Sequence, residues 1–323
     1  MTETGPLFCI RGFSTSAGSQ KPGLGMEDGF ELWGGRMYAA IGMSGAGKTV
    51  LNSFFMGCPA FRLAACDVDG QFFSVRLDGS AFASRGGMSR RWRQVRRAGV
   101  LLYLPQHLPD GRGFDMSVRE YYLQVVLALL RECGTRRTSA DVLSVFDRER
   151  DALERLAKSL ASKLDKPLNR LSGGERRRVE LIARMYALRE LPRDRKCLLV
   201  LDEPTTGLDV PGVKDYLLAL RTCFRECATE NVAILVTTHA IHLLRDDDVF
   251  DEVVLVRKLE DVRSGDISCW ASRPLPVGMM TERWIGPAYG TGEEAWAEFL
   301  EAQSHLSQAA FVAERNERMG LSC

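Results

Sequence analysis

Several features that define whole classes of protein are missing from this sequence of 323 residues. No run approaches the ~18 to 20 uninterrupted apolar residues that a membrane-spanning helix needs. The first residues, MTETGPLFCIRGF, lack a basic leader followed by an apolar segment. The sequence also shows no internal repeat and no low-complexity segment. We therefore expect a protein that neither spans a membrane nor is secreted.

An excess of charge of one sign is lacking as well. The 43 Lys and Arg residues stand against 42 Asp and Glu, which leaves a formal net charge of +1. No global field therefore draws the chain to nucleic acid or to anionic lipid, and such contacts would have to be local. The nine cysteines never form a CxxC pair of zinc-binding spacing, so we interpret them as reduced thiols.

Four short apolar runs, each bounded by charged or turn residues, indicate buried strands: MYAAIG (37–42), VLLYLP (100–105), CLLVLD (197–202) and VAILVTT (232–238). Amphipathic stretches alternate with these runs. Because strands that are apolar on both faces need helices on both sides, the pattern predicts an α/β fold with a largely parallel sheet.

The remaining segments predict how the chain is divided. A helical pattern without strand signals indicates a separate helical lobe at about 110–172, and the Gly/Ser-rich stretch from Ser14 to Gly29 predicts a loop. A Pro/Gly-rich connector follows Ser272 and leads to a last amphipathic helix that begins near Thr291. We therefore predict one domain over 1–272, and a connector and C-terminal helix over 273–323. The apolar stripe of that helix would dock on the domain itself or on a second subunit.

The segment GMSGAGKT, Gly42 to Thr49, fits the pattern GxxxxGK[ST] between an expected strand and an expected helix. Its glycines allow successive backbone N–H groups to face one anion, and the start of the helix adds its positive end. Lys48 supplies a point charge, and the Thr49 hydroxyl would hold Mg²⁺. The alternative is an ordinary glycine-rich turn, which the strand and helix context disfavours.

Two adjacent acids, Asp202 and Glu203, follow the strand in CLLVLDEPTTGLD. At the carboxyl end of a parallel strand they lie where such sheets bind ligands. Asp202 would hold the Mg²⁺ shell, and Glu203 could orient and polarise a water for attack on a phosphate. The alternative is that one acid caps the following turn.

A third segment, LSGGE from Leu171 to Glu175, opens a helix and exposes N–H groups at its two glycines. Ser172 is placed to cap that helix. This makes a second anion site, which one nucleotide could reach only if the fold joins the two sites or a second chain supplies one of them.

These segments, together with Gln106 after one strand (LPQH) and His239 after another (TTHA), resemble in this order an ATP-binding cassette (ABC) ATPase over about residues 5–270. The resemblance implies a P-loop fold of the ABC type, with a RecA-like core, an N-terminal β subdomain and a helical lobe. It also implies binding of ATP and Mg²⁺ and hydrolysis of ATP.

The resemblance also implies roles for individual residues. Lys48, Gln106, Glu203 and His239 would be catalytic, with Gln106 as the lid glutamine and His239 as the γ-phosphate switch. Thr49, Gln106 and Asp202 would hold the metal. In this family LSGGE covers the ATP of the other protomer, so two ATPs would join a head-to-tail dimer. The residues implied to bind ATP are Gly42, Ser44, Gly45, Ala46, Gly47, Lys48, Thr49, Val50, Ser172, Gly173, Gly174 and Asp209.

Within the family, SGAGKT followed by LNSFFMG, the run MSVREYY and LSGGERRRVEL resemble more loosely the G subfamily and related bacterial exporter cassettes. We therefore expect an ATPase subunit, of an exporter ahead of an importer, that is cytoplasmic and held at the inner face of the membrane by a permease on a separate chain. The second cassette would be a copy of this chain or a paralogue. The sequence does not indicate the transported substrate.

Two segments depart from the resemblance or stand outside it. Most cassettes place an aromatic residue against adenine at the position of Ala17, so that Phe13 would have to substitute or adenine would be held loosely. The basic segment from Arg85 to Arg97 surrounds Trp92. We interpret it as a solvated helix, ahead of a contact with lipid or a partner, and with nucleic acid third.

The rival hypothesis is a soluble cassette ATPase that acts on a nucleic-acid or protein partner without transport. Translation-type members carry two cassettes in one chain, and DNA-maintenance members insert long coiled coils or zinc modules. Neither feature is present in this sequence. A degenerate cassette that serves as a scaffold is disfavoured because every catalytic position is intact.

Overall fold

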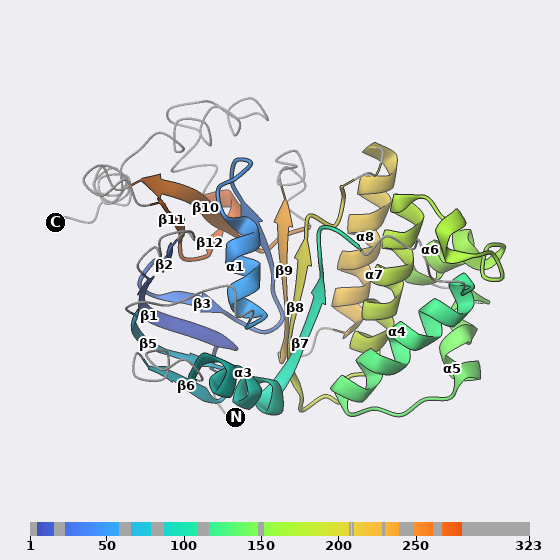
Figure 1. The fold of residues 1–323 in the computed structure, drawn as a ribbon, viewed down its shortest axis with the longest axis horizontal. Helices are drawn as coiled ribbons and strands as arrows, with labels where there is room; N and C mark the ends of the chain where they lie inside the picture. The colour runs from blue at the N-terminus through green and yellow to red at the C-terminus, as the bar shows by residue number, and fades with distance from the viewer. Residues whose placement is uncertain are drawn as a thin grey trace.

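The computed structural model describes most of the chain up to Met279, namely residues 5–15, 23–57, 66–78, 87–108, 116–147, 152–206, 208, 210–227, 230–238, 249–260 and 267–279. Within these residues the chain forms one sheet of twelve strands that is covered by helices (Figure 1). The predicted C-terminal helix, Asp209, His239 and Ala17 lie outside the described residues.

Five parallel strands form the centre of the sheet. Four of them are the predicted apolar runs: β4 (Met37–Ile41), β7 (Gly99–Leu104), β8 (Lys196–Asp202) and β9 (Val232–Thr238). Their order is β4-β9-β8-β7, and β10 (Glu252–Glu260) lies parallel to β4 on its other side. Every residue of β4 and β9 is buried, because helices cover both faces. The prediction of an α/β fold with a parallel sheet is confirmed.

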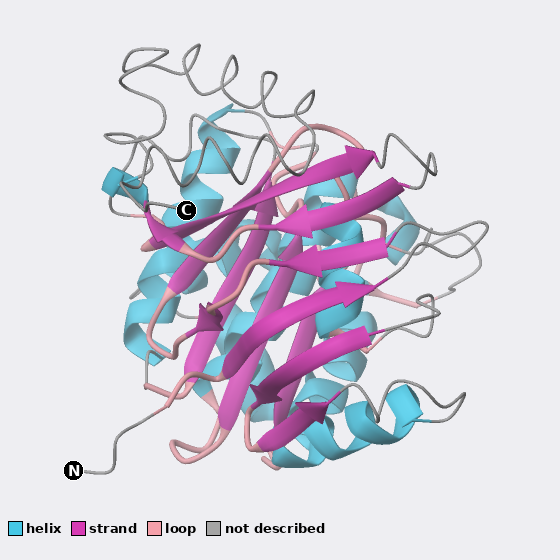
Figure 2. Ribbon diagram, turned by 90° about the vertical axis from the view of Figure 1, so that its left-hand side faces the viewer, coloured by secondary structure: helices cyan, strands magenta, loops and turns pink. Residues whose placement is uncertain are grey.

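A second, mainly antiparallel group of strands extends the sheet beyond β10 and forms the β subdomain (Figure 2). Its order is β6-β5-β1-β2-β11, with β3 paired to β1. The strands are β1 (Phe8–Thr15), β2 (Gly23–Met26), β3 (Phe30–Leu32), β5 (Cys66–Phe72), β6 (Val75–Asp78) and β11 (Ile267–Ala271).

The prediction of a loop from Ser14 to Gly29 is wrong for part of this stretch. β1 continues to Thr15, and residues 23–26 form β2, which pairs with β1 and β11. Gly25 has a packing role there, because a Cβ at this position would lie 2.9 Å from Trp270 Cδ1. Composition alone does not distinguish a glycine that permits a turn from one that admits a neighbouring ring.

Helices pack against the two faces of the sheet in two separate cores. α1 (Lys48–Phe55) and α3 (Gly87–Ala98) belong to one core, together with the β subdomain. Alternate residues of β8 divide between the cores, as the period of a strand requires. The other core contains α4 (Val118–Cys133), α5 (Ser139–Leu143), η1 (Ser144–Phe146), α6 (Ala152–Ala161), η2 (Leu168–Arg170), α7 (Gly173–Arg189) and α8 (Val210–Cys227). The predicted helical lobe corresponds to α4, α5 and α6, which lie beyond α7 in Figure 1.

The sheet continues past Ser272, where we predicted the first domain to end. β12 (Leu275–Pro276) pairs with β10 and is followed by the short helix α9 (Val277–Met279). Leu275 and Val277 are buried in the same core as α8. We therefore propose that the domain extends at least to Met279, since these residues are part of its packed interior.

The basic segment forms helix α3, with its arginines on the outside. Trp92 is buried, and its indole N–H donates to the carbonyl oxygen of Phe54 at 3.0 Å. Arg91 pairs with Asp78 at 3.0 Å, whereas Arg90 and Arg93 are exposed. The aromatic residue is thus core, which favours the interpretation as a solvated helix.

Neither a disulfide nor a membrane span occurs in the part of the chain that the structure describes. The cysteines with described side chains form no disulfide, and Cys223 and Cys227 on α8 are among them. None of the described helices combines the length and the hydropathy that a membrane-spanning segment needs.

Candidate functional site

The glycine-rich loop between β4 and α1 is shaped by close backbone approaches. Gly45 and Gly47 have φ angles of 77° and 101°, in the left-handed region that suits glycine. A Cβ on Gly47 would lie 2.4 Å from Cys269 Sγ, and a Cβ on Gly42 would lie 2.0 Å from the carbonyl oxygen of Val256. The loop therefore packs against β10 and β11 and leads into the N-terminus of α1, where free backbone N–H groups favour anions.

Lys48 begins α1 and directs its ammonium group back along this loop. Its Nζ donates to the carbonyl oxygens of Gly42, at 2.8 Å, and Met43, at 3.1 Å. The same atom lies 4.0 Å from Glu203 Oε1. The side chain is 4% exposed, and burial lowers the pKa of Lys48 to about 8 although Glu203 and Asp202 act to raise it. The charge thus lies between the loop and the two carboxylates.

The carboxylate of Asp202, at the end of β8, is oriented from both neighbouring strands. Thr237 on β9 donates its hydroxyl to Oδ1 at 2.7 Å, and Tyr103 on β7 donates its hydroxyl to Oδ2 at 3.2 Å. The residue is buried. Because each carboxylate oxygen has two lone pairs, Asp202 keeps capacity to accept a further ligand.

Glu203 follows β8 in a strained backbone conformation, with a φ angle of 46°. Its N–H donates to the carbonyl oxygen of Thr237 at 3.0 Å, and its Oε2 accepts from Gln106 Nε2 at 2.7 Å. A residue other than glycine persists at positive φ only where its surroundings hold it. The turn directs the Glu203 side chain toward Gln106 and Lys48.

The fold thus brings Lys48, Gln106, Asp202 and Glu203 together at the carboxyl ends of β7 and β8. The loop before α1 lies at this same edge of the sheet (Figure 1). The other predicted residues of the loop differ in exposure: Ser44 and Thr49 are exposed, Ala46 is buried and Val50 is half-buried.

Four polar residues of this site escaped the sequence analysis. Tyr103 and Thr237 orient Asp202, and Asn52 donates its Nδ2 to Thr237 Oγ1 at 3.2 Å. Arg177 on α7 donates to the carbonyl oxygen of Glu203 at 2.9 Å. Tyr103 and Thr237 lie near the carboxyl ends of predicted strands. Because ligands bind at this end of a parallel sheet, their position could have identified them as candidate site residues. No pattern distinguishes Arg177 from the arginines on either side of it.

The segment LSGGE begins α7, and Ser172 caps the helix as predicted. The Ser172 hydroxyl accepts from the N–H of Glu175 at 3.2 Å, while the Glu175 carboxylate accepts from the N–H of Ser172 at 3.0 Å. Lys163 pairs with Glu175 and lowers the pKa of that carboxyl group. Ser172 and Gly173 are exposed, and a Cβ on Gly173 would meet open space. This helix start is therefore accessible to a ligand.

Phe13 does not replace the missing adenine-stacking residue. Its side chain is 3% exposed, and its ring centroid lies 4.8 Å from that of Phe54 in an edge-to-face contact. Of the two open alternatives, substitution by Phe13 is therefore disfavoured, because this ring belongs to the core between α1 and the β subdomain.

The donors near the loop suit a hard divalent cation. They are the Thr49 hydroxyl, the Asp202 carboxylate and the Gln106 amide oxygen, all of them oxygen ligands. Among the described residues no group of three His, Cys, Asp or Glu side chains could hold a metal ion. Mg²⁺ commonly takes one or two protein carboxylates, with the rest of its shell from phosphates and water, so the residues present fit Mg²⁺ bound together with a nucleotide.

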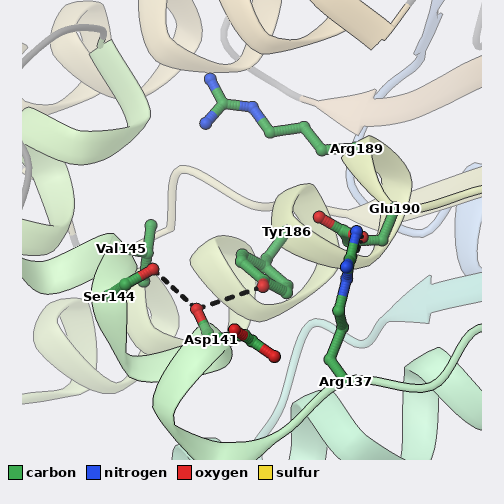
Figure 3. Close-up of a pocket in the computed structure, with 7 residues that line it drawn as sticks. All are labelled: Arg137, Asp141, Ser144, Val145, Tyr186, Arg189 and Glu190. Atoms are coloured by element: carbon green, nitrogen blue, oxygen red, sulfur yellow. Dashed lines mark hydrogen bonds and ion pairs between the residues drawn. The ribbon is translucent and has the colours of Figure 1, made fainter.

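A cavity of about 240 Å³ lies on the helical lobe (Figure 3). It is lined by Tyr186 and Arg189, which lie at the other end of α7 from Ser172. Its charged groups are paired, Arg137 with Glu190 and Arg189 with Glu226. Tyr186 donates its hydroxyl to the carbonyl oxygen of Asp141 at 3.3 Å. We assign this cavity no part in nucleotide binding, since its polar groups serve one another. It is lined by Arg137, Asp141, Ser144, Val145, Tyr186, Arg189 and Glu190.

Comparison with known proteins agrees with the family inferred from the motifs. The family model described as ABC transporter matches residues 27–206. The zinc import ATP-binding protein ZnuC of Paracoccus denitrificans is 29% identical, and the alignment covers 98% of this chain and 98% of that protein. The cytochrome c biogenesis ATP-binding export protein CcmA of Shigella flexneri is 36% identical over 43% of this chain and 64% of its own length.

Solved structures show the same fold. The structure of an ATP-binding subunit of an ABC transporter superposes with a TM-score of 0.56 at 19% identity, over 91% of this chain and 99% of that one. The expected preference for export finds no support among the relatives named here, which are named for import and for export alike. The chain belongs to the ABC transporter family, as one of its ATP-hydrolysing, nucleotide-binding subunits.

Proposed function

We propose that this chain binds Mg²⁺-ATP at the loop Gly42 to Thr49 and that its hydrolysis of ATP drives a membrane permease on a separate chain. The observation that carries the proposal is the convergence of Lys48, Gln106, Asp202 and Glu203 at one edge of the sheet, beside that loop. A loop built for anions, a buried cation and an oriented pair of carboxylates are the groups that phosphoryl transfer to water requires.

Each residue has a defined task in this mechanism. The N–H groups of the loop bind the phosphate chain, and Lys48 neutralises negative charge that develops on the γ-phosphate. Glu203, held by Gln106, accepts a hydrogen bond from the attacking water and orients it. Thr49, Asp202 and Gln106 would hold Mg²⁺, which neutralises phosphate charge when bound. His239 would act as the γ-phosphate switch and Asp209 would help to bind ATP, as the resemblance implied.

A second cassette, either a copy of this chain or a paralogue, completes the proposed site. Ser172, which caps α7, and Gly173, which begins it, are exposed, and the half-buried Gly174 follows them. Within the described part of the chain, the hydrogen bonds of Ser172 stay inside α7 and none reaches the phosphate-binding loop. An exposed helix start with free N–H groups is suited to the phosphates of an ATP held by another protomer.

The proposed permease partner is supported by what the relatives are named for. The protein EcfA of Methanosphaera stadtmanae is named an energy-coupling factor transporter ATP-binding protein, and ZnuC a zinc import ATP-binding protein. Binding to such a permease would hold this chain at the inner face of the membrane.

The experiment is affinity purification from detergent-solubilised cells followed by mass spectrometry. We expect an integral membrane protein with several spanning helices to co-purify and to stimulate ATP hydrolysis when the two are reconstituted. Recovery of nucleic acid or of soluble proteins alone would contradict the transport function and favour the rival soluble ATPase. A Lys48→Ala chain, purified in parallel, separates partners that need bound ATP from those that do not.

We expect the affinity for ATP to fall as the pH rises above about 8. The pKa of Lys48 is lowered to about 8, so the side chain is charged below this pH and neutral above it. Bound phosphate favours the charged form, so binding takes up a proton and the Kd for ATP rises by at most ~10-fold per pH unit. Folding stability changes in the opposite direction: Lys48 makes it increase with pH between about 8 and 10.5, because the unfolded chain binds more protons than the folded chain in this window.

The measurement is calorimetric titration with a non-hydrolysable ATP analogue at several pH values, in buffers of different ionisation enthalpy. Lys48→Arg is the control, because arginine stays charged throughout this range. A Kd that is constant up to pH 9.5, or the same pH dependence in Lys48→Arg, would remove Lys48 as the group that titrates.

A further inference from the structure

Arg177 joins helix α7 to the strand ends that carry the proposed hydrolytic residues. Its side chain is buried, with the residue 6% exposed. Nη1 donates to the carbonyl oxygen of Glu203 at 2.9 Å and to that of Asp202 at 3.5 Å, and Nη2 donates to the carbonyl oxygen of Gln106. One guanidinium group thus binds the backbones of three residues whose side chains act in the proposed mechanism.

Two of these backbone segments need such support. Glu203 has a φ angle of 46°, a conformation that persists only when neighbouring groups hold it. Gln106 lies just beyond the end of β7, where the strand's ladder of hydrogen bonds no longer fixes the chain. A planar guanidinium presents several donors in a rigid fork, so it can hold both segments at once, whereas the ammonium group of a lysine would act as a single point charge.

The charge of Arg177 has a consequence beyond the hydrogen bonds of its guanidinium group. Within the described residues, no carboxylate lies at ion-pair distance from Arg177, and its guanidinium group donates only to neutral carbonyl oxygens. A buried charge without a carboxylate in contact is costly, although Asp202 and Glu203 act on the charge of Arg177 from beyond ion-pair distance. The positive charge of Arg177 lies behind Asp202 and Glu203. It would stabilise the negative charge that a bound nucleotide adds beside these carboxylates during hydrolysis.

A second arginine of the same helix strengthens the link to β7. Arg184 donates to the carbonyl oxygen of Tyr103 at 2.7 Å and pairs with Glu180, which also accepts from the hydroxyl of Tyr121 on α4. Tyr103 in turn contacts Asp202. The end of β7 is therefore fastened to α7 at two points, and α7 begins with the exposed Ser172.

We propose that Arg177 is a positioning residue for hydrolysis: it holds Gln106 and Glu203 in the arrangement that orients the attacking water, and it couples this arrangement to the start of α7. A ligand that binds at Ser172 and displaces α7 would displace Gln106 and Glu203 through Arg177. This inference rests on the proposed function, and it assigns the residue through which the two anion-binding segments communicate.

The test is the Arg177→Met variant, with Arg225→Met as the matched control. Arg225 is an exposed residue of α8. Since Arg177 does not contact the phosphate-binding loop, we expect the Kd for ATP to change by less than ~3-fold, while kcat falls by ~30- to 100-fold. Arg177→Lys keeps the charge and part of the hydrogen bonding, so its kcat should lie between those of wild type and Arg177→Met. The control should have the wild-type kcat.

A double-mutant cycle separates positioning from a general effect on structure. In a Glu203→Gln background the water is no longer oriented, so adding Arg177→Met should lower residual single-turnover hydrolysis by no more than ~3-fold. A structural role would instead lower both backgrounds by the same factor. Thermal unfolding shows whether each variant is folded. If Arg177→Met is not folded, the same double-mutant cycle is measured with Arg177→Lys.

Two results would overturn the inference: a wild-type kcat in a folded Arg177 variant, or equal losses of hydrolysis in the two backgrounds. Failure of the proposed function is recognised separately, because wild-type protein would then hydrolyse no ATP or Glu203→Gln would hydrolyse it normally. Both of these outcomes are read without any Arg177 variant.

Discussion

Replacing Glu203 with glutamine should lower steady-state ATP hydrolysis by ~100- to 1,000-fold while changing the Kd for ATP by less than ~3-fold. The amide keeps the shape of the side chain but loses the negative charge that orients the water. Lys48, whose Nζ lies 4.0 Å from Glu203 Oε1, remains in place to bind phosphate. The variant should therefore accumulate as an ATP-bound dimer. Rates of phosphate release, equilibrium binding and sedimentation in the presence of ATP measure these effects.

Two control variants define what this result means. Asp165→Asn removes a carboxylate that pairs with Arg119 at an exposed surface, and it should leave hydrolysis unchanged. Glu203→Asp keeps a carboxylate but withdraws it from Gln106, so it should retain part of the activity. Hydrolysis by Glu203→Gln at the wild-type rate would remove Glu203 from its proposed role.

Mixing two inactive variants should restore activity if the site is completed by a second cassette. Lys48→Ala removes the phosphate-binding charge, and Ser172→Arg places a long side chain at the exposed start of α7. In a mixed dimer one of the two sites combines the intact loop of one chain with the intact LSGGE of the other. With random mixing we expect at most about a quarter of the wild-type rate, because half of the dimers are mixed and each has one working site.

The controls for this experiment are the variants alone and a mixture in which both chains carry Lys48→Ala. All of these should remain inactive. Mixed dimers are demonstrated by two affinity tags, so that absence of rescue cannot be attributed to absence of pairing. If the mixed dimers form but hydrolyse no ATP, the proposal that each site is completed by the other chain and works independently is contradicted.

Local parts of the structure could be predicted from residues that are close in sequence. The loop from Gly42 to Thr49 is made of contiguous residues, so its glycines and its place between a strand and a helix were sufficient to identify it as a candidate anion-binding loop. The cap at Ser172 is likewise a contact within one helical turn. The central strands followed from short continuous apolar runs bounded by charged or turn residues, which strands buried on both faces need.

The sequence by itself thus determined the family, the order of the motifs and the residues expected to act on ATP. The tertiary structure decided how those residues are held. Thr237 reaches Asp202 because β9 lies beside β8, and Arg177 reaches Glu203 and Gln106 because α7 packs against the ends of β7 and β8. It also decided that Phe13 is core and that residues 23–26 form a strand. These contacts join residues far apart in the chain, and they depend on strand order and packing, which no local pattern encodes.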